Sequence, residues 1–162
     1  MKDIIIVSLI LLALLCVVFK DVIFQDNLFV KRDASRYYYP HRNFAAQMIR
    51  QGEVPLWNPY LFCGTPFHAS IQNSVFYPLS AIYYIMPFDK GFGLFIIFHI
   101  FLAGIFMYLF MRVCNVSKQG SFLSALAFAF SGHIMSAISL TINLNADVVS
   151  SSNAHIYQGP KT

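Results

Sequence analysis

Apolar residues in this chain gather in long runs that shorter polar stretches separate. The first run is the sixteen residues Ile4–Phe19, and it resumes at Val22–Phe24 after Lys20 and Asp21. A helix of that length rises about 24 Å, short of the roughly 30 Å hydrocarbon core of a bilayer. The resumed run supplies the missing length if the Lys20 ammonium reaches back to the interface. No small-residue cleavage pattern follows, so residues 1–24 are predicted to form an uncleaved N-terminal transmembrane anchor.

Two later runs are long enough to cross a membrane. Residues 91–113 read GFGLFIIFHIFLAGIFMYLFMRV, and residues 119–140 read QGSFLSALAFAFSGHIMSAISL. In the second run Ser121, Ala125 and Ala129 recur at every fourth position, which aligns small side chains on one face of a helix. Such ridges let membrane helices approach closely. We expect two transmembrane helices, with close packing along the ridge; a ligand groove is the alternative use of the same face.

Residues 75–90 are apolar but too short to span. The stretch VFYPLSAIYYIMP is interrupted by Pro78, closed by Pro87 and rich in tyrosine, a residue common at membrane–water interfaces. Its length is typical of an interfacial or re-entrant helix. The last residues, 141–162, are polar and lack helical periodicity. They are interpreted as a poorly ordered tail of a truncated or frame-altered product.

A long loop, residues 25–74, connects the anchor to the interfacial segment. Pro40 stands where a helix can begin, and Gly52 stands where it can stop. Between them the sequence HRNFAAQMIRQ places apolar residues on one side of a helix and charged and amide residues, Arg42 among them, elsewhere. The pattern predicts a short amphipathic helix that lies on the membrane surface.

From residue 52 the loop reads GEVPLWNPYLFCGTPFHASIQNSVFYPL. Proline fixes φ, removes an amide donor and pushes the preceding residue toward extended geometry. The steps Val54–Pro55, Asn58–Pro59 and Thr65–Pro66 therefore predict a stiff, shaped segment, unlike a flexible Gly/Ser linker. Non-helical backbone near membrane depth is tolerated where it is buried in protein or lines a wet cavity. The segment is thus either the cover of a functional cavity or an aromatic structural plug.

Composition agrees with a membrane protein. Hydrophobic residues make up 57% of the chain and charged residues 11%, against about 25% charged residues in soluble domains. Together with the apolar runs, this defines an all-α integral membrane class. The net charge of +4 does not indicate nucleic-acid binding; basic residues beside tyrosine and phenylalanine favour phosphate or anionic headgroups. The three cysteines form no C-x-x-C pair, which gives a zinc or redox site little support.

Four segments of the chain resemble the YfhO-like family of bacterial membrane proteins. They are KRDASRYYYPHRNF, GEVPLWNPYLFCGTPFHASIQNSVFYPL, LAGIFMYLFMR and LAFAFSG, between about Asp33 and Gly132. The resemblance implies the N-terminal part of a GT-C-like glycosyltransferase fold in a multi-pass protein of the bacterial cytoplasmic membrane. It implies that residues 25–74 are extracytoplasmic. It also implies a polyprenyl-phosphate-linked sugar donor and a cell-envelope polymer, teichoic acids included, as acceptor.

Asp33 matches the acidic loop position at which GT-C enzymes hold a catalytic carboxylate. A carboxylate there can take the proton from an attacking hydroxyl, or hold a divalent metal ion beside the leaving phosphate. Many such enzymes have a second acid next to the first, whereas Ala34 follows here, so metal dependence stays open. The alternative is a surface carboxylate paired with Arg32 or Arg36.

Seven further residues are predicted to bind substrate. Guanidinium groups hold phosphate through paired hydrogen bonds, and aromatic faces suit sugars or prenyl chains; the alternative is a basic rim that attracts anionic lipid. The others match family positions and are expected to shape the cover of a cavity. The set is Arg36, Tyr38, Arg42, Glu53, Trp57, Asn58 and Gln72. A non-catalytic flippase or assembly partner for lipid-linked sugars is the alternative to a transferase.

The side of the membrane on which the loop lies and the role of two histidines are left open by the sequence. The positive-inside rule would put the basic loop in the cytoplasm, whereas the resemblance puts it outside. Arg112 and Lys118 agree with the resemblance if residues 75–87 do not cross the membrane. His99 and His133 lie inside apolar helices, where a histidine either serves a function or satisfies itself against a neighbouring helix.

Overall fold

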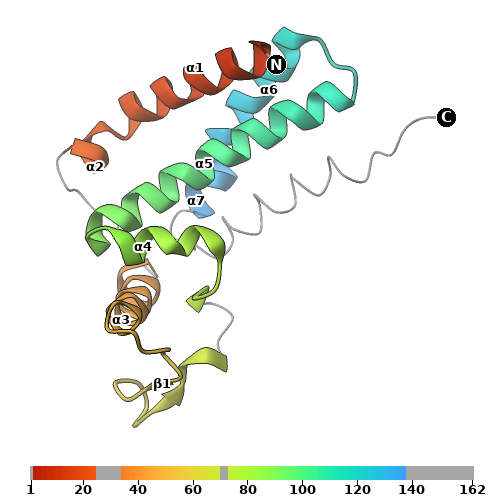
Figure 1. The fold of residues 1–162 in the computed structure, drawn as a ribbon. Helices are drawn as coiled ribbons and strands as arrows, with labels where there is room; N and C mark the ends of the chain where they lie inside the picture. Colours follow the sequence, from red (N-terminus) through yellow and green to blue (C-terminus); the bar gives the residue numbers. More distant parts are fainter. Residues whose placement is uncertain (1, 25–33, 70–72, 138–162) are drawn as a thin grey trace.

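The computed structural model describes residues 2–24, 34–69 and 73–137 of the 162-residue chain. This part is largely helical, which confirms the helical class that the apolar runs predict. Figure 1 shows α1 and α6 running alongside α5, while α3, α4 and a small hairpin lie together near the beginning of α5. The long helices are α1 (Lys2–Val18), α5 (Phe88–Val113) and α6 (Lys118–Ala129), and the short α7 (Gly132–Ala137) follows α6.

Two helical segments are long and apolar enough to cross a membrane. One is α5, and the other is α6 with α7, residues Lys118–Ala137. The first begins one turn before the predicted run, at Phe88. The second is interrupted after Ala129, where Phe130 and Ser131 form a turn. Residues 138–140 of the predicted second run, and the predicted tail at 141–162, lie outside the described residues.

The N-terminal apolar segment is divided in the structure, although the sequence predicts one continuous anchor. α1 ends at Val18, Phe19 forms a turn, and α2 (Lys20–Phe24) follows. The division lets Val22 pack on the first turns of α5. A Cβ added at Gly93 would lie 2.7 Å from Val22 Cγ1, a separation that packed atoms do not adopt. Contact with this bare glycine therefore holds α2 against α5.

Small residues bring the three long helices together. Ser121, Ala125 and Ala129 are fully buried, which confirms the close packing predicted for this ridge. A Cβ added at Gly104 of α5 would lie 3.2 Å from a Leu11 methyl carbon of α1 and 3.3 Å from the Ala129 Cβ of α6. Gly104 is therefore the point at which α1, α5 and α6 meet. At the far end of the bundle, exposed Asp3 and Lys118 form an ion pair at 2.8 Å.

The loop forms a second layer at the beginning of α5. It starts with a π-helical turn, η1 (Ala34–Tyr38), and continues directly into α3 (Tyr39–Arg50) with Pro40 in its first turn. A 3-10 turn, η4 (Pro78–Ala81), leads into the short α4 (Ile82–Ile85). In Figure 1, α3 lies beneath α4, which in turn lies against the first turns of α5.

Two polar side chains attach α3 to the helices above it. The Arg50 guanidinium donates to the carbonyl oxygens of Tyr83, at 2.7 Å, and of Met86. These acceptors lie at the end of α4, where carbonyl groups lack helical partners. At the other end of α3, the Tyr39 hydroxyl donates to the Asp89 carboxylate of α5. Burial, followed by this hydrogen bond and the carboxylate charge, raises the pKa of Tyr39 to about 12.

The Pro/Gly-rich stretch folds into a small hairpin. Strand β1 (Trp57–Asn58) pairs antiparallel with β2 (Thr65–Pro66), and the 3-10 turn η2 (Phe67–Ala69) follows. The connecting turn contains three consecutive residues with positive φ: Phe62 at 46°, Cys63 at 61° and Gly64 at 115°. The Trp57 ring covers Gly64, since a Cβ there would lie 2.5 Å from ring carbon Cζ2. The other side of the ring faces outward, and 55% of Trp57 is exposed.

Two glycine substitutions separate the effect of ring contact from that of backbone strain. Gly52 and Gly64 both have positive φ, but a Cβ at Gly52 meets nothing within 4 Å. We expect Gly52→Ala to cost about 1–2 kcal/mol of loop stability through strain alone. Gly64→Ala should cost more, because the Trp57 ring must also move. The only tryptophan in the chain reports this through its fluorescence: the emission should shift in Gly64→Ala and not in Gly52→Ala. Equal spectra in the two variants would contradict the ring contact.

Candidate functional site

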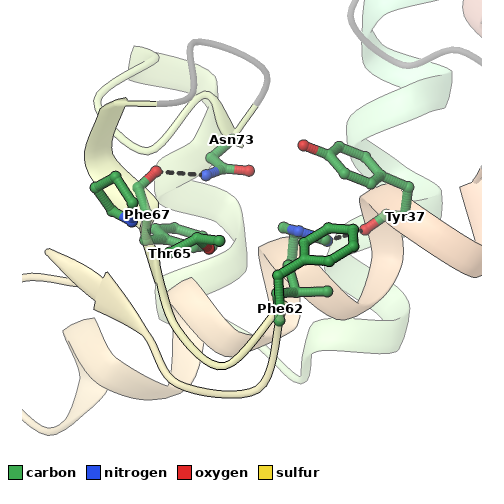
Figure 2. Close-up of a pocket in the computed structure, with 8 residues that line it drawn as sticks. Tyr37, Phe62, Thr65, Phe67 and Asn73 are labelled. Atoms are coloured by element: carbon green, nitrogen blue, oxygen red, sulfur yellow. Dashed lines mark hydrogen bonds between the residues drawn. The ribbon is translucent and has the colours of Figure 1, made fainter.

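Two hollows lie on either side of His41, between the beginning of α3 and the hairpin. The first, here called the aromatic cavity, has a volume of about 210 Å³ and is shown in Figure 2. The second, here called the outer hollow, has a volume of about 360 Å³. Tyr37, His41, Leu61, Phe62, Thr65, Pro66, Phe67 and Asn73 line the aromatic cavity. Arg36, Pro40, His41, Phe44, Asn58, Tyr60 and Leu61 line the outer hollow.

His41 forms the wall that the two hollows share. Its ring is 7% exposed and stacks on the Tyr37 ring, with 4.1 Å between the ring centroids. Its Nδ1 lies 2.6 Å from the Tyr37 carbonyl oxygen; because a carbonyl can only accept, Nδ1 carries the proton. The Phe67 side chain, which is 2% exposed, also stacks with the His41 ring, with 6.1 Å between the ring centroids. The His41 ring is therefore fixed between the start of α3 and the hairpin.

Arg42 points away from both hollows, toward the helices. The sequence pattern places Arg42 on the polar side of an amphipathic helix, and the structure contradicts this: the side chain is 2% exposed. Its Nη1 donates to the Tyr83 hydroxyl of α4 at 2.8 Å. Its guanidinium carbon lies 5.0 Å from the centroid of the Phe95 ring of α5. Aromatic faces attract a cation, which offsets part of the cost of burying it.

Half of this guanidinium has no partner in the described part of the chain. Nε and Nη2 are buried without a hydrogen bond, and no carboxylate pairs with Arg42 there. Arginine keeps its charge in proteins, and a buried donor without a partner is costly. Nε and Nη2 together form one edge of the guanidinium fork, the edge that binds two oxygens of one phosphate or carboxylate. The arrangement is therefore suited to an anion at this position.

The tyrosines near Arg42 keep their protons. Burial raises the pKa of Tyr83, although the charge of Arg42 opposes this effect. Burial also raises the pKa of Tyr77, whose hydroxyl lies 3.0 Å from His99 Nε2. His99 is fully buried, and its Nδ1 lies 2.7 Å from the Phe95 carbonyl oxygen. Nδ1 must donate there, so Nε2 accepts from Tyr77. Both ring nitrogens of His99 are thus satisfied, which supports the structural alternative for this histidine.

The predicted site residues are only partly brought together. Arg36 and Asn58 line the outer hollow, and Tyr38 is buried without lining either hollow. Asn58 is 4% exposed and its Oδ1 accepts from the Tyr60 amide at 2.9 Å, so it shapes the hairpin. Glu53 is exposed and Trp57 half-exposed, and neither lines the described hollows. Asp33 and Gln72 lie outside the described residues, so the structure does not locate them.

Among the residues of the aromatic cavity that were not predicted from the sequence are Tyr37, His41, Phe62 and Asn73. His41 directly precedes Arg42, and Asn73 follows a predicted site residue, so both stood within quoted motifs. Phe62 carried no signal, because a positive φ at phenylalanine has no sequence signature. Within residues 2–24, 34–69 and 73–137, no three His, Cys, Asp or Glu side chains gather as they would around a metal ion.

Comparisons with known proteins add no relative. No family model, no curated protein and no solved structure matches this chain.

Proposed function

We propose that this chain binds a polyprenyl-phosphate-linked sugar at a membrane surface and belongs to a YfhO-like, GT-C-type glycosyltransferase. The observation that carries the proposal is the buried Arg42 guanidinium, one edge of which has no hydrogen-bond partner within the described residues. A lipid phosphate supplies the two oxygens that this edge can bind. The motifs at residues 33–132, quoted in the sequence analysis, independently support a lipid-linked sugar as the ligand class.

The position of Arg42 suits a phosphate attached to a lipid. Arg42 contacts Phe95 and Tyr83, and Phe95 lies two turns into a helix long and apolar enough to span a membrane. An anion bound there would lie where the polar loop meets apolar helices. A prenyl chain could then follow the apolar helix surfaces while its phosphate stays at the interface. A soluble phosphate compound would gain nothing from this position, which is why we favour a lipid.

In the proposed reaction, Asp33 takes the proton from a hydroxyl of a cell-envelope polymer as that oxygen attacks the anomeric carbon of the sugar. The bond between the sugar and the lipid phosphate breaks, and the phosphate leaves with the bonding electrons. Arg42 stabilises the charge that develops on the leaving phosphate. A divalent ion held by Asp33 would act in the same way. The alternative function is a flippase or assembly partner that holds the same lipid without transferring its sugar.

Replacement of Arg42 separates binding from stability. We expect Arg42→Met to weaken binding of a polyprenyl monophosphate by about 10- to 100-fold, the equivalent of one or two charged hydrogen bonds. The thermal unfolding midpoint should stay equal or rise, because an apolar residue of similar size removes the cost of a buried, half-satisfied charge. Binding is measured on the full chain in lipid nanodiscs, with the matching polyprenol, which lacks phosphate, as the ligand control.

Arg112→Met is the matched protein control. Arg112 lies at the other end of α5, is exposed, and donates to the Val116 carbonyl oxygen. This variant should bind the polyprenyl phosphate as the unmodified chain does. Equal binding of polyprenol and polyprenyl phosphate, or full binding by Arg42→Met, would remove the phosphate site. A large loss of stability in Arg42→Met would indicate that the arginine serves the fold.

Asp33→Asn decides between transferase and carrier. The amide keeps the side-chain shape but can neither accept the hydroxyl proton nor bind a cation strongly. If Asp33 is the base or the metal ligand, sugar incorporation into envelope polymer should fall about 100-fold or more, while the amount of protein in the membrane stays normal. The measurement uses the complete gene product in a strain that lacks the native copy. Normal incorporation would favour the flippase or assembly function.

The side of the membrane on which the loop lies is tested at Cys63. We propose the bacterial cytoplasmic membrane, with residues 25–74 extracytoplasmic, as the resemblance implies. Cys63 is exposed in the hairpin turn, whereas Cys16 and Cys114 are half-buried. With Cys16→Ser and Cys114→Ser in place, a membrane-impermeant thiol reagent should label Cys63 on intact cells. Labelling that appears only after the inner face is opened would reverse the topology.

A further inference from the structure

The aromatic cavity contains a buried acceptor without a donor. Asn73 is 4% exposed, and its Nδ2 donates to the Phe67 carbonyl oxygen at 2.7 Å. Its Oδ1 is buried and has no hydrogen-bond partner within the described residues. Figure 2 shows the Asn73 side chain and the Tyr37 hydroxyl facing each other across the cavity. Because the amide nitrogen is already engaged, the orientation of the asparagine is fixed and only its acceptor is available.

This acceptor selects the charge of a ligand. A hydroxyl or amide N–H can donate to Asn73 Oδ1, whereas a carboxylate or phosphate oxygen brings a second acceptor and is repelled. A cation is also a poor match, since no carboxylate among the described residues lines the cavity and the Arg36 guanidinium lines the adjacent hollow. Among the other polar groups of the wall, the hydroxyls of Tyr37 and Thr65 can donate as well as accept, and the His41 ring lines the cavity too. The cavity therefore favours a neutral ligand that carries several hydroxyl groups.

The cavity wall also supplies an aromatic surface. Phe62 is 91% exposed and has a φ of 46°, a left-handed conformation that is rare for a bulky residue. Cys63, next to it, has the same conformation. The backbone thus holds a large apolar ring at the edge of the cavity, where it gains little from burial. The C–H face of a sugar ring packs well on such an aromatic ring, while its hydroxyl groups project sideways toward polar side chains.

We propose that the aromatic cavity is a binding subsite for one neutral pyranose ring. Phe62 packs against the apolar face of the ring, and Asn73 Oδ1 accepts a hydrogen bond from a hydroxyl or acetamido N–H. The Tyr37 hydroxyl binds a second polar group of the ring. A volume near 210 Å³ lies below the roughly 300–1,000 Å³ of pockets for larger ligands, so one ring fits better than an oligosaccharide. The inference rests on the proposed function in one respect: the ring belongs either to the lipid-linked donor or to the polymer acceptor.

Binding of small glycosides tests the subsite directly. The full chain in nanodiscs is titrated with methyl glucopyranoside and its 2-acetamido analogue, and binding is observed on the ligand by saturation-transfer NMR. Glucuronate and tetramethylammonium are the anionic and cationic probes. We expect the two neutral glycosides to bind and the charged probes to bind at least 5-fold more weakly. Preferential binding of glucuronate or tetramethylammonium, or no binding of either neutral glycoside, would overturn the proposal.

Two substitutions test whether the glycosides bind in the aromatic cavity. Phe62→Ala should reduce glycoside binding at least 5-fold, and Tyr37→Phe should reduce it less, because the ring that stacks on His41 remains. Phe76→Ala is the matched control: Phe76 is 70% exposed and contacts His68, outside the cavity. Phe62→Ala removes a mostly exposed side chain, so the fold should tolerate it; unchanged thermal unfolding verifies this. Equal losses of glycoside binding in Phe62→Ala and Phe76→Ala would overturn the assignment of the sugar subsite to the aromatic cavity.

These experiments distinguish a failure of the proposed phosphate site from a failure of the proposed sugar subsite. Arg42→Met should weaken binding of polyprenyl phosphate about 10- to 100-fold and leave methyl glycoside binding unchanged. If the ring belongs to the donor, attaching a sugar to the polyprenyl phosphate strengthens binding, and Phe62→Ala removes only that gain. If the ring belongs to the acceptor, Phe62→Ala instead weakens binding of a short polymer fragment. No change of either kind in Phe62→Ala would overturn the subsite even if the phosphate site is correct.

Discussion

A buried positive charge constrains the whole junction between the loop and the helices. The Arg42 guanidinium is surrounded by the Phe95 and Tyr83 rings and makes one hydrogen bond to a hydroxyl. Removing such a group from water is costly. Two aromatic rings and one tyrosine hydroxyl offset part of that cost, and Nε and Nη2 stay without a partner within the described residues. These groups meet where α3 crosses α4 beside the first turns of α5, and Tyr39 and Arg50 attach the two ends of α3 there.

Two adjacent residues of α3 divide the site into two environments. Successive residues on a helix point about 100° apart, so His41 faces the hairpin while Arg42 faces α4 and α5. One side has a buried guanidinium with an unpartnered edge; the other, in the described residues, has aromatic and polar side chains, among them the unpartnered Asn73 Oδ1. A lipid-linked sugar carries the same two chemistries, a charged phosphate and a neutral ring. Under the proposed function, this correspondence accounts for the presence of a rigid aromatic segment beside helices suited to lipid.

The sequence allowed the helices to be predicted much better than the site. Long apolar runs and a ridge of small residues depend only on local spacing, so residues 91–113 and Ser121, Ala125 and Ala129 could be placed before the fold was known. Arg42 could not: amphipathic periodicity assumes that arginine faces water, and tertiary contacts with Phe95 and Tyr83 overrode that rule. The break at Phe19 depends on the approach of Val22 to Gly93, which is a long-range contact. Asp33 and Gln72 stay predictions, because they lie outside the described residues.

The dependence of α4 on Arg50 couples the stability of α4 to that of α3. A helix of four residues is far below the length at which a helix is stable in isolation. Its terminal carbonyl groups receive their donors from an arginine that precedes them by more than thirty residues in the chain. The form of α4 therefore depends on the docking of α3. Because α4 in turn holds the Tyr83 hydroxyl against Arg42, the two segments supply each other's polar groups with partners, and loss of either contact should weaken both.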